Sequence, residues 1–418
     1  MPTTIYRLPR LAVGCAVVAL TAALSLLAPV RALAEPVTLA EALARASSTS
    51  PIITAAEADV AAAQGRAQQA GFRPNPELDL EVENFAGTGG FSGVNDAETT
   101  LAIGQRFELG GKRTARRRAA EAEVATAGLK LEVARADLER DVREAYAEAF
   151  AAGRRVELAR DQFERAENLS TIATELVDAG REPPLRAIRA RTAAFEAVGR
   201  VRAAEAEYAQ AQRALAALWG GSDNLPEPLV GDESVPVLTV DPTETLDVRL
   251  AEAEVETSVA VVDRERTASR PDLTVSVGAR QFAGTDDTAL LFGASMPIGL
   301  FDRNQGNIAA ANAERTGAEA RRNAALAASV RRTRDARAAL QTAEARLTFL
   351  DTRAEPEAIE AVRIAREGFS AGRFTLLDVL DAEEALNTVQ SEMITAQLDR
   401  SRAIAALTRA NETEGQAQ

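Results

Sequence analysis

The sequence predicts a mainly α-helical fold with a β-barrel part, in which one structural unit occurs twice. Two repeated patterns lead to this fold class. Residues 73–88 begin with Arg-Pro, continue with an alternating run and end with Phe-Ala-Gly-Thr, and residues 270–285 repeat this order. The triplet Ala-Gly-Arg at residues 179–181 returns at residues 371–373. We therefore expect an internally duplicated chain whose halves each contain a β-hairpin and a long α-helical hairpin.

The first 34 residues are expected to be a signal peptide. Arg7 and Arg10 form a basic start, a long apolar run follows, and residues 32–34 read Ala-Leu-Ala, a small-residue cleavage site. Because the apolar run is long for a signal, an uncleaved anchor is the alternative. The only cysteine, Cys15, lies inside this run, so we expect neither a lipidated N-terminus nor a disulfide.

The composition disfavours several classes of partner and chemistry. Of the 48 basic residues, three arginines lie in the leader, which leaves 45 against 62 acidic residues and a net charge of −17. Such a charge argues against nucleic acid as a partner. The chain has no histidine, and its cysteine lies in the leader, so the usual general base, nucleophile and transition-metal ligands are missing. We expect no enzyme, no cofactor and no metal site.

Each half is expected to open with a helix. Thr38 and Glu41 have the spacing of a capping box, and a helical pattern follows to about Gly71. Residues 241–244 form a second such box, with proline at the first helical position. The stretch before it is rich in glycine and proline and is typical of a connector.

The predicted parts follow from these signals. They are a signal peptide at 1–34, a first repeat at 35–220, a connector at 221–241, a second repeat at 242–412 and a tail at 413–418. Within the repeats we expect β-hairpins at 77–107 and 272–298 and long helical hairpins at 112–219 and 307–411.

Alternation identifies the strands of both β-hairpins. Apolar and acidic residues alternate along residues 77–83, and alternating segments also cover about 99–104, 273–278 and 289–296. Period-2 segments of about 8–10 residues joined by Gly-rich loops are typical of transmembrane barrel hairpins.

The absence of proline identifies the long helices. None occurs between Lys112 and Asp178, where apolar residues recur at spacings of three, four or seven, so we expect a rod of about 100 Å. The copy in the second half is expected to be broken or restarted near residues 355–356, where the sequence reads Glu-Pro. An Ala-Gly-Arg turn ends each rod, and a second helix returns.

Four strands cannot close a barrel, and open sheet edges are not tolerated in lipid. No stretch after the leader has the roughly 20 apolar residues of a spanning helix. Three copies of the chain would give a transmembrane barrel of twelve strands with a lumen, whereas eight strands would leave an interior that side chains fill. We therefore expect a homotrimer that forms a channel.

Three motifs resemble a known family. Residues 105–116 (QRFELGGKRTAR) and 296–307 (MPIGLFDRNQGN) resemble the hairpin ends of TolC-type outer-membrane factors, in their heavy-metal, CzcC-like branch. Residues 372–382 (GRFTLLDVLDA) resemble the tip motif of the whole superfamily. The likeness covers nearly the whole chain after the leader. A lipidated N-terminal cysteine, which many members have, is missing, which leaves anchoring to the barrel.

The resemblance implies a twelve-stranded barrel in the outer membrane of a Gram-negative cell and an α-barrel across the periplasm. It implies docking to a periplasmic adaptor (membrane fusion protein) and an inner-membrane RND pump. The expected function is that of an exit duct for heavy-metal cations of the cobalt, zinc, cadmium and nickel class. A duct for drugs or other organic compounds is the alternative. A periplasmic adaptor or coiled-coil scaffold is a further alternative, but its single hairpin would not explain two equivalent halves.

The tip motif supplies the candidate gate. Asp378 and Asp381 are three apart at the start of a returning helix and share a face. They could simply complement the helix dipole, but the matching residues of the first half, Arg186 and Arg189, would oppose it. By resemblance, the two acids match carboxylates that ring a closed periplasmic aperture. We expect all four residues to belong to the gate.

The two Ala-Gly-Arg turns supply a candidate contact with the adaptor. A tight reversal alone would account for their glycines. Because the tips of such a tube face the cell interior, we also expect them to touch the adaptor. These residues are Ala179, Gly180, Arg181, Ala371, Gly372 and Arg373.

Acidic residues of the first strand supply a candidate pore lining. Asp79, Glu81 and Glu83 alternate with apolar residues, and charge on a lipid-facing surface is costly. We expect these acids on the lumen side, where they either only solvate the wall or also guide cations.

Overall fold

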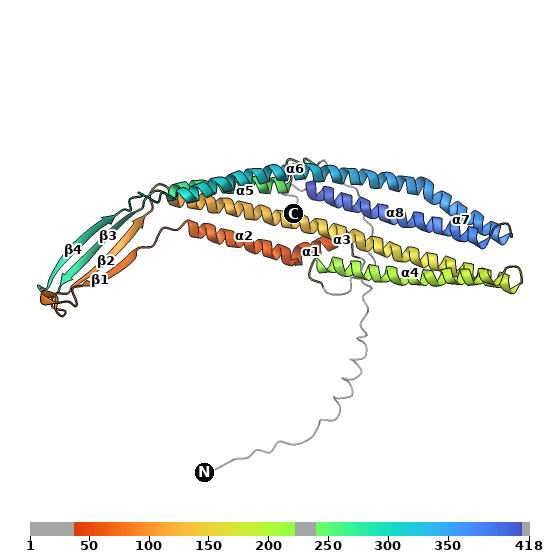
Figure 1. The fold of residues 1–418 in the computed structure, drawn as a ribbon, viewed down its shortest axis with the longest axis horizontal. Coiled ribbons are helices and arrows are strands. Elements are labelled where there is room, and N and C mark those ends of the chain that lie inside the picture. The colour runs from red at the N-terminus through yellow and green to blue at the C-terminus, as the bar shows by residue number, and fades with distance from the viewer. Residues whose placement is uncertain (1–36, 222–239, 412–418) are drawn as a thin grey trace, which may run out of the picture.

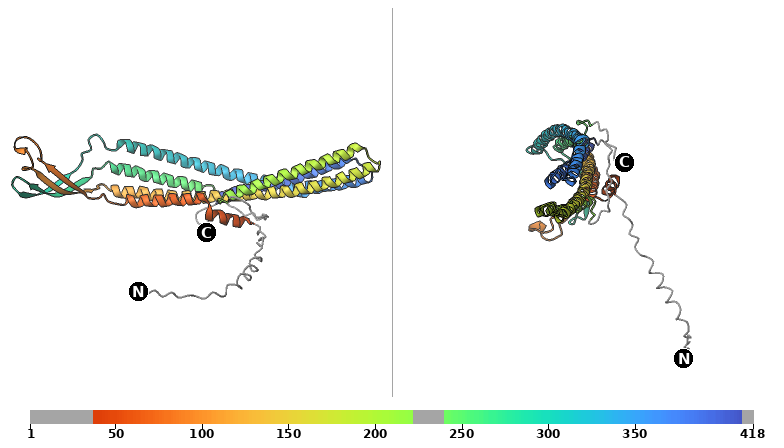
Figure 2. Two further views of the ribbon diagram at one scale, coloured as in Figure 1. Left: turned by 90° about the horizontal axis from the view of Figure 1, so that it is seen from below. Right: turned by 90° about the vertical axis from the view of Figure 1, so that its right-hand side faces the viewer.

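The computed structural model describes residues 37–221 and 240–411. The predicted signal peptide, nearly all of the predicted connector and the predicted tail lie outside these ranges. Within them, the molecule is long and narrow, with a sheet at one end and two helical hairpins at the other (Figures 1 and 2).

The elements of the first repeat are α1 (Leu39–Thr49), α2 (Pro51–Ala70), β1 (Glu77–Glu83), a short 3₁₀ turn (Gly89–Phe91), β2 (Glu98–Phe107), α3 (Lys112–Asp178) and α4 (Pro184–Ala217). Those of the second are α5 (Leu246–Ala268), β3 (Leu273–Phe282), β4 (Asp287–Ser295), α6 (Gln305–Phe349), a π-helical turn, η2 (Leu350–Ala354), α7 (Glu355–Ser370) and α8 (Leu376–Asn411). The expected mixture of long duplicated helices and four strands is confirmed.

The four strands form one antiparallel sheet in the order β1-β2-β3-β4. The central pair, β2 and β3, joins the two repeats, with register from Glu98 opposite Phe282 to Phe107 opposite Leu273. Strands β1 and β4 are the edges of the sheet, and each has a partner on only one side.

The core is thin and rich in alanine, as suits closely packed helices. Its largest cluster lies where α1 meets α3 and α4, and includes Val142, Tyr146 and Leu215. The Tyr146 hydroxyl donates a hydrogen bond of 2.8 Å to the Val37 carbonyl oxygen. This contact fixes the start of the described chain to the middle of the α3 rod.

The rod of the second repeat is interrupted, as expected from its Glu-Pro dipeptide. The π-helical turn Leu350–Ala354 separates α6 from α7, and Pro356 lies in the first turn of α7. Proline has no N–H to donate to the preceding turn, so an α-helix cannot continue unchanged through it. The first repeat has no such break, because α3 runs for 67 residues.

Two expectations about the first helix were wrong in part. The helix expected from Thr38 to Gly71 is divided at Ser50, which is extended and precedes Pro51. Proline disfavours helical geometry at the residue before it. Thr38 does accept a hydrogen bond of 3.2 Å from the Glu41 amide, but the Glu41 carboxylate pairs with Arg45, so the capping box is only half formed.

The second predicted capping box, at residues 241–244, is wrong. Helix α5 begins later, at Leu246, and its N-cap is Thr245. The Asp241 carboxylate instead accepts hydrogen bonds from the amide and the hydroxyl of Thr243, at 2.8 and 2.7 Å, which makes a local turn. Asx turns of this kind compete with helix capping for the same side chain.

Within the described ranges, no helix is both long and apolar enough to cross a membrane.

Candidate gate and duct lining

The two helical hairpins of one chain meet in a common apolar cluster near their tips. Its buried members come from all four helices: Leu169 and Ala173 of α3, Ala190 of α4, Ala365 and Phe369 of α7, and Leu376 and Val379 of α8. The hairpins are therefore packed against one another close to the point where each one turns.

Both turns have the same backbone geometry. Gly180 and Gly372 have φ angles of +69° and +70°, in the left-handed region that favours glycine. The amide of the next residue closes each turn, since Arg181 donates to the Leu176 carbonyl at 2.9 Å and Arg373 donates to the Gly368 carbonyl at 2.8 Å. The six predicted tip residues are all exposed, at the end of the molecule opposite the sheet.

Asp378 caps the helix on which it lies. Its carboxylate accepts hydrogen bonds from the amide and hydroxyl of Thr375, at 2.6 and 2.8 Å, and the Thr375 hydroxyl accepts one from the Asp378 amide at 3.3 Å. These are the two halves of a capping box. The hydrogen bonds from Thr375 hold the pKa of Asp378 below its usual value. Asp381, one turn further on, is exposed.

The matching arginines are arranged differently. Arg186 forms an ion pair of 2.8 Å with Glu182, just before α4 begins. This acid offsets the unfavourable charge of an arginine in the first helical turn, so the charge of Arg186 does not by itself indicate a functional role. Arg189 is exposed. Across the described part of the chain, no hydrogen bond or ion pair joins either arginine to Asp378 or Asp381.

A cross-hairpin cluster behind the tips was missed from the sequence. The Glu383 carboxylate of α8 pairs with Arg165 of α3 at 2.9 Å and with Arg366 of α7. Arg165 also donates a hydrogen bond of 2.8 Å to the Asn387 side chain. The Glu383 side chain is only 13% exposed. Its partner Arg165 is 218 positions away along the chain, so only the packing of the helices reveals the pair.

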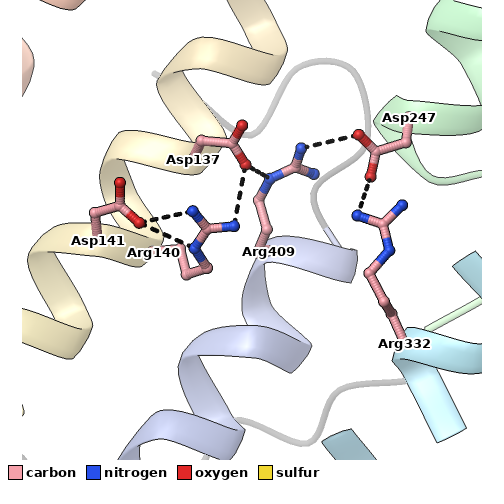
Figure 3. Close-up of polar contacts among 6 residues, drawn as sticks. All are labelled: Asp137, Arg140, Asp141, Asp247, Arg332 and Arg409. Carbon is pink, nitrogen blue, oxygen red and sulfur yellow. Dashed lines mark hydrogen bonds and ion pairs between the residues drawn. The ribbon is translucent and has the colours of Figure 1, made fainter. Parts of the chain in front are cut away.

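A second ionic cluster ties the repeats together near the middle of the molecule (Figure 3). Arg409 of α8 bridges Asp137 of α3, at 2.7 Å, and Asp247 of α5, at 3.3 Å. Asp247 also pairs with Arg332 of α6, at 3.1 Å, and Asp137 with Arg140, at 3.4 Å. The Arg409 side chain is 8% exposed, so this end of α8 is held between elements of both repeats.

The sheet has one polar and one apolar face. Residues directly opposite each other in neighbouring strands share a face, which places Asp79, Glu81 and Glu83 beside Thr100 and Arg280. The apolar face carries large side chains that are 45% exposed or more: Leu78, Leu80, Val82, Leu101, Ile103, Val277, Leu290 and Phe292. The predicted lumen acids thus lie on the face opposite the apolar one.

Arg280 fixes the charge pattern of the polar face. Its guanidinium pairs with Glu83 and Glu98, both at 2.8 Å, and donates a hydrogen bond of 2.8 Å to the Thr100 hydroxyl. It therefore links β1, β2 and β3 on this face.

Among the described residues, no group of histidine, cysteine or acidic side chains is arranged so that it could hold a metal ion.

An amphipathic sheet joined to long paired helices defines a membrane-associated channel protein. The chain belongs to the outer membrane efflux protein family, whose model matches residues 42–221 and 243–411. It is an outer membrane protein that functions in efflux, and its family consists of channels and not of enzymes. The family predicted from the three motifs is confirmed.

Relatives and solved structures agree with this assignment. The chain is 32% identical to the cobalt-zinc-cadmium resistance protein CzcC of Cupriavidus metallidurans, over 85% of both chains. It is 34% identical to the nickel and cobalt resistance protein CnrC of the same organism, over 65% of this chain and 66% of that one.

The fold is shared with solved outer membrane proteins. A CusC structure superposes with a TM-score of 0.80 at 17% identity, over 91% of this chain and 93% of that one. VceC from Vibrio cholerae has a TM-score of 0.76 at 23% identity, over 90% of this chain and 97% of that one.

Proposed function

We propose that this protein is the exit duct of a tripartite RND-type efflux system that exports heavy-metal cations of the cobalt, zinc, cadmium and nickel class. The observation that carries the proposal is its 32% identity, over 85% of both chains, to a cobalt-zinc-cadmium resistance protein. The duct is passive, and it receives its cargo from an inner-membrane RND pump through a periplasmic adaptor.

The proposed working unit is a homotrimer. Each sheet has two free edges, β1 and β4, and three copies that pair edge to edge would form one closed sheet of twelve strands. The helices have free faces as well. Leu185, Ile188 and Phe195 of α4 are 56% to 70% exposed and recur at helical spacing. Ile359 and Ile364 of α7 are 51% and 45% exposed. Contacts between copies would cover these side chains.

The polar face of the sheet is the proposed lumen wall. In a closed sheet, the apolar face turns toward lipid, and Asp79, Glu81 and Glu83 turn inward. Arg280 neutralises part of the charge of Glu83 and Glu98, whereas Asp79 and Glu81 are exposed. An acidic wall raises the local concentration of cations and excludes anions.

The proposed gate lies at the hairpin tips. Around a threefold axis, Asp378 and Asp381 would form two rings of three acids, and Arg186 and Arg189 would lie on the alternate hairpins. Capping by Thr375 supports this role, because it fixes the position of the Asp378 carboxylate and keeps it ionised. The exposed tip residues, Ala179 to Arg181 and Ala371 to Arg373, are the proposed adaptor contact.

Growth of a strain that lacks the protein tests the cargo. The strain is plated on gradients of zinc, cobalt, cadmium and nickel, beside a panel of dyes and antibiotics. Selective sensitivity to metals, reversed by the intact gene, is the expected result. Sensitivity to organic compounds alone would retain the exit duct and contradict the metal assignment.

A further inference from the structure

A cavity of about 650 Å³ lies between helices α6 and α8, near the middle of the molecule. Helices α3 and α5, with the residue before α5, also contribute lining side chains, namely Arg140, Asp247 and Thr245. A volume of this size lies within the range of small-molecule binding sites, which are concave and mostly apolar with a few convergent polar groups. The side chains that line the cavity therefore indicate which kind of molecule it would accept.

The middle of the cavity is lined by two rows of alanine, one on each helix. Within each row the alanines recur at spacings of three and four, which places them on one side of the helix. The rows are Ala336, Ala339 and Ala343 of α6 and Ala403, Ala406 and Ala410 of α8. Because the alanine side chain ends at Cβ, the two rows leave a space that suits a narrow apolar body.

An arginine lies at each end of the alanine row on α6. Arg332 and Arg346 both line the cavity, and they are about 21 Å apart along the helix axis at a rise of 1.5 Å per residue. Arg332 is 57% exposed and pairs with Asp247 through one nitrogen, at 3.1 Å. Arg346 is 42% exposed and pairs with Glu392 through one nitrogen, at 3.4 Å. A guanidinium carries five N–H donors, so each arginine retains donors for a second acceptor.

A buried hydroxyl without a partner lies at the Arg332 end. Thr333 is 1% exposed and lines the cavity, and its hydroxyl has no hydrogen-bond partner within the described part of the chain. The hydroxyl of Ser329, one turn earlier, does donate to the Pro242 carbonyl at 2.8 Å. Burying a hydroxyl without a hydrogen bond is costly, and an oxygen atom of a bound molecule would supply the missing acceptor.

We propose that this cavity binds an organic dianion with a narrow apolar body, whose acidic groups pair with Arg332 and Arg346 at its two ends. The apolar body lies over the alanine rows, and the Thr333 hydroxyl donates to the acidic group beside Arg332. An anion is favoured over a cation because the lining holds five arginines and three aspartates. Two of these aspartates, Asp247 and Asp399, already pair with arginines of the lining.

An occupied cavity would brace the joint between the two repeats. Arg332 and Asp247 belong to the ionic cluster in Figure 3, and Arg346 lies at the other end of the cavity. A molecule that binds only the folded protein stabilises it in proportion to its affinity and concentration. The cavity is thus an effector site, separate from the proposed gate and lumen wall, through which an organic acid in the periplasm would stabilise the duct.

Isothermal titration calorimetry of the full chain in lipid nanodiscs tests the site, with terephthalate as the probe. Benzoate has the same ring with one acidic group, and terephthalamide has the same shape without charge. Empty nanodiscs correct for partitioning into lipid. Ala339→Phe places a ring in the alanine row of α6, and Arg346→Gln removes one cationic end. The matched control is Ala338→Phe, which changes a neighbouring exposed alanine that does not line the cavity.

The expected result is saturable binding of terephthalate to the wild type and no binding of terephthalamide. Losing one charged hydrogen-bonding group should weaken binding about tenfold, whether the group is lost from the ligand, as in benzoate, or from the protein, as in Arg346→Gln. Ala339→Phe should abolish binding, because the ring occupies the space of the ligand, whereas Ala338→Phe should bind terephthalate as the wild type does.

Three results would overturn the proposal. Equal affinities of Ala338→Phe and Ala339→Phe would show that terephthalate binds elsewhere. Binding of terephthalamide as tight as that of terephthalate would show that the arginines play no part. A wild type without saturable binding would show that another part of the assembled protein fills the cavity. If Ala339→Phe does not assemble, the comparison of the three ligands and of Arg346→Gln with the wild type still decides.

Discussion

The two helical hairpins of this chain share one turn geometry but carry opposite charges just after the turn. Gly180 and Gly372 close the turns with nearly identical φ angles, yet the residues that follow differ in sign at three matching positions. Arg186, Arg189 and Arg191 of the first hairpin correspond to Asp378, Asp381 and Glu383 of the second. The duplicated backbone thus gives both hairpins the same shape, while their side chains give each one a different part in the proposed gate.

The rods of the two hairpins differ as well. Helix α3 is continuous for 67 residues, whereas its counterpart is divided by the π-helical turn Leu350–Ala354. A π turn places one extra residue in the helix and changes its direction. The first rod is therefore one uninterrupted helix, whereas the second is interrupted at one defined place.

Bulky residues at the tips should abolish efflux. Ala179→Trp and Ala371→Trp change exposed positions whose φ angles, −77° and −81°, accept any side chain. If both hairpins contact the adaptor, each variant should lose metal resistance in growth assays while trimers persist in detergent. Loss of resistance with only one variant would show that the adaptor distinguishes the hairpins. Loss of the trimer with both would instead favour a purely structural turn.

Removing Arg409 should weaken the joint between the repeats. Arg409→Ala leaves Asp137 and Asp247 without their shared partner. Breaking a buried ion pair in this way lowers the free energy of unfolding by about 3 kcal/mol. The midpoint of denaturant unfolding should fall accordingly. Arg402→Ala is the matched control, because that side chain is 49% exposed and pairs with Glu148 at the surface. Arg402→Ala should lower the free energy of unfolding by about 1 kcal/mol or less. Equal midpoints for the two variants would contradict the proposed joint.

Removing the Glu383 carboxylate should loosen the contacts of α8 with α3 and α7. Glu383→Gln breaks the links to Arg165 and Arg366, and the loss of such charged hydrogen bonds costs about 1–3 kcal/mol. We expect more frequent openings of the reconstituted channel in single-channel recordings. Arg191→Gln, at the corresponding position of α4, is the control and should leave the opening frequency unchanged. A similar increase in both variants would remove the distinction between the hairpins.

Removing the cap of α8 should change how the tip responds to acid. Because the pKa of Asp378 is lowered in the folded chain, the stabilisation from its hydrogen bonds is complete above the usual aspartate pKa and is lost as the pH falls through the lower, folded value. In Thr375→Ala these hydrogen bonds are absent at every pH. The protection factors of the amide hydrogens at residues 372–380, which correct for the intrinsic exchange rate at each pH, should fall with acid in the wild type but change little in the variant. The same acid response in both proteins would contradict this role for Thr375.

The sequence predicted the fold because its signals are local and occur twice. The alternation of apolar and polar residues predicted the strands, and the proline-free stretch from Lys112 to Asp178 coincides with α3. Local signals also led to the errors. The motif at residues 241–244 has the composition of a capping box, but the Asp241 side chain turns back to Thr243. A capping box and a local turn compete for one carboxylate there, and the sequence does not distinguish them.

The candidate site was predictable only in part. The positions of the glycines and the acidic residues predicted the hairpin tips, because the tip motif at residues 372–382 is continuous along the chain. The clusters around Glu383 and Arg409 were missed, since their partners lie on other helices and the spacing of charges along α8 does not identify them.

The ion selectivity of the reconstituted channel, measured from reversal potentials in a gradient of zinc chloride, tests the proposed gate most directly. We predict that the wild type prefers cations and that Asp378→Asn with Asp381→Asn lowers this preference, while the matched pair Arg186→Gln with Arg189→Gln raises it. A wild-type channel without cation preference, or equal potentials in all three proteins, would contradict an acid-gated exit duct for metal cations.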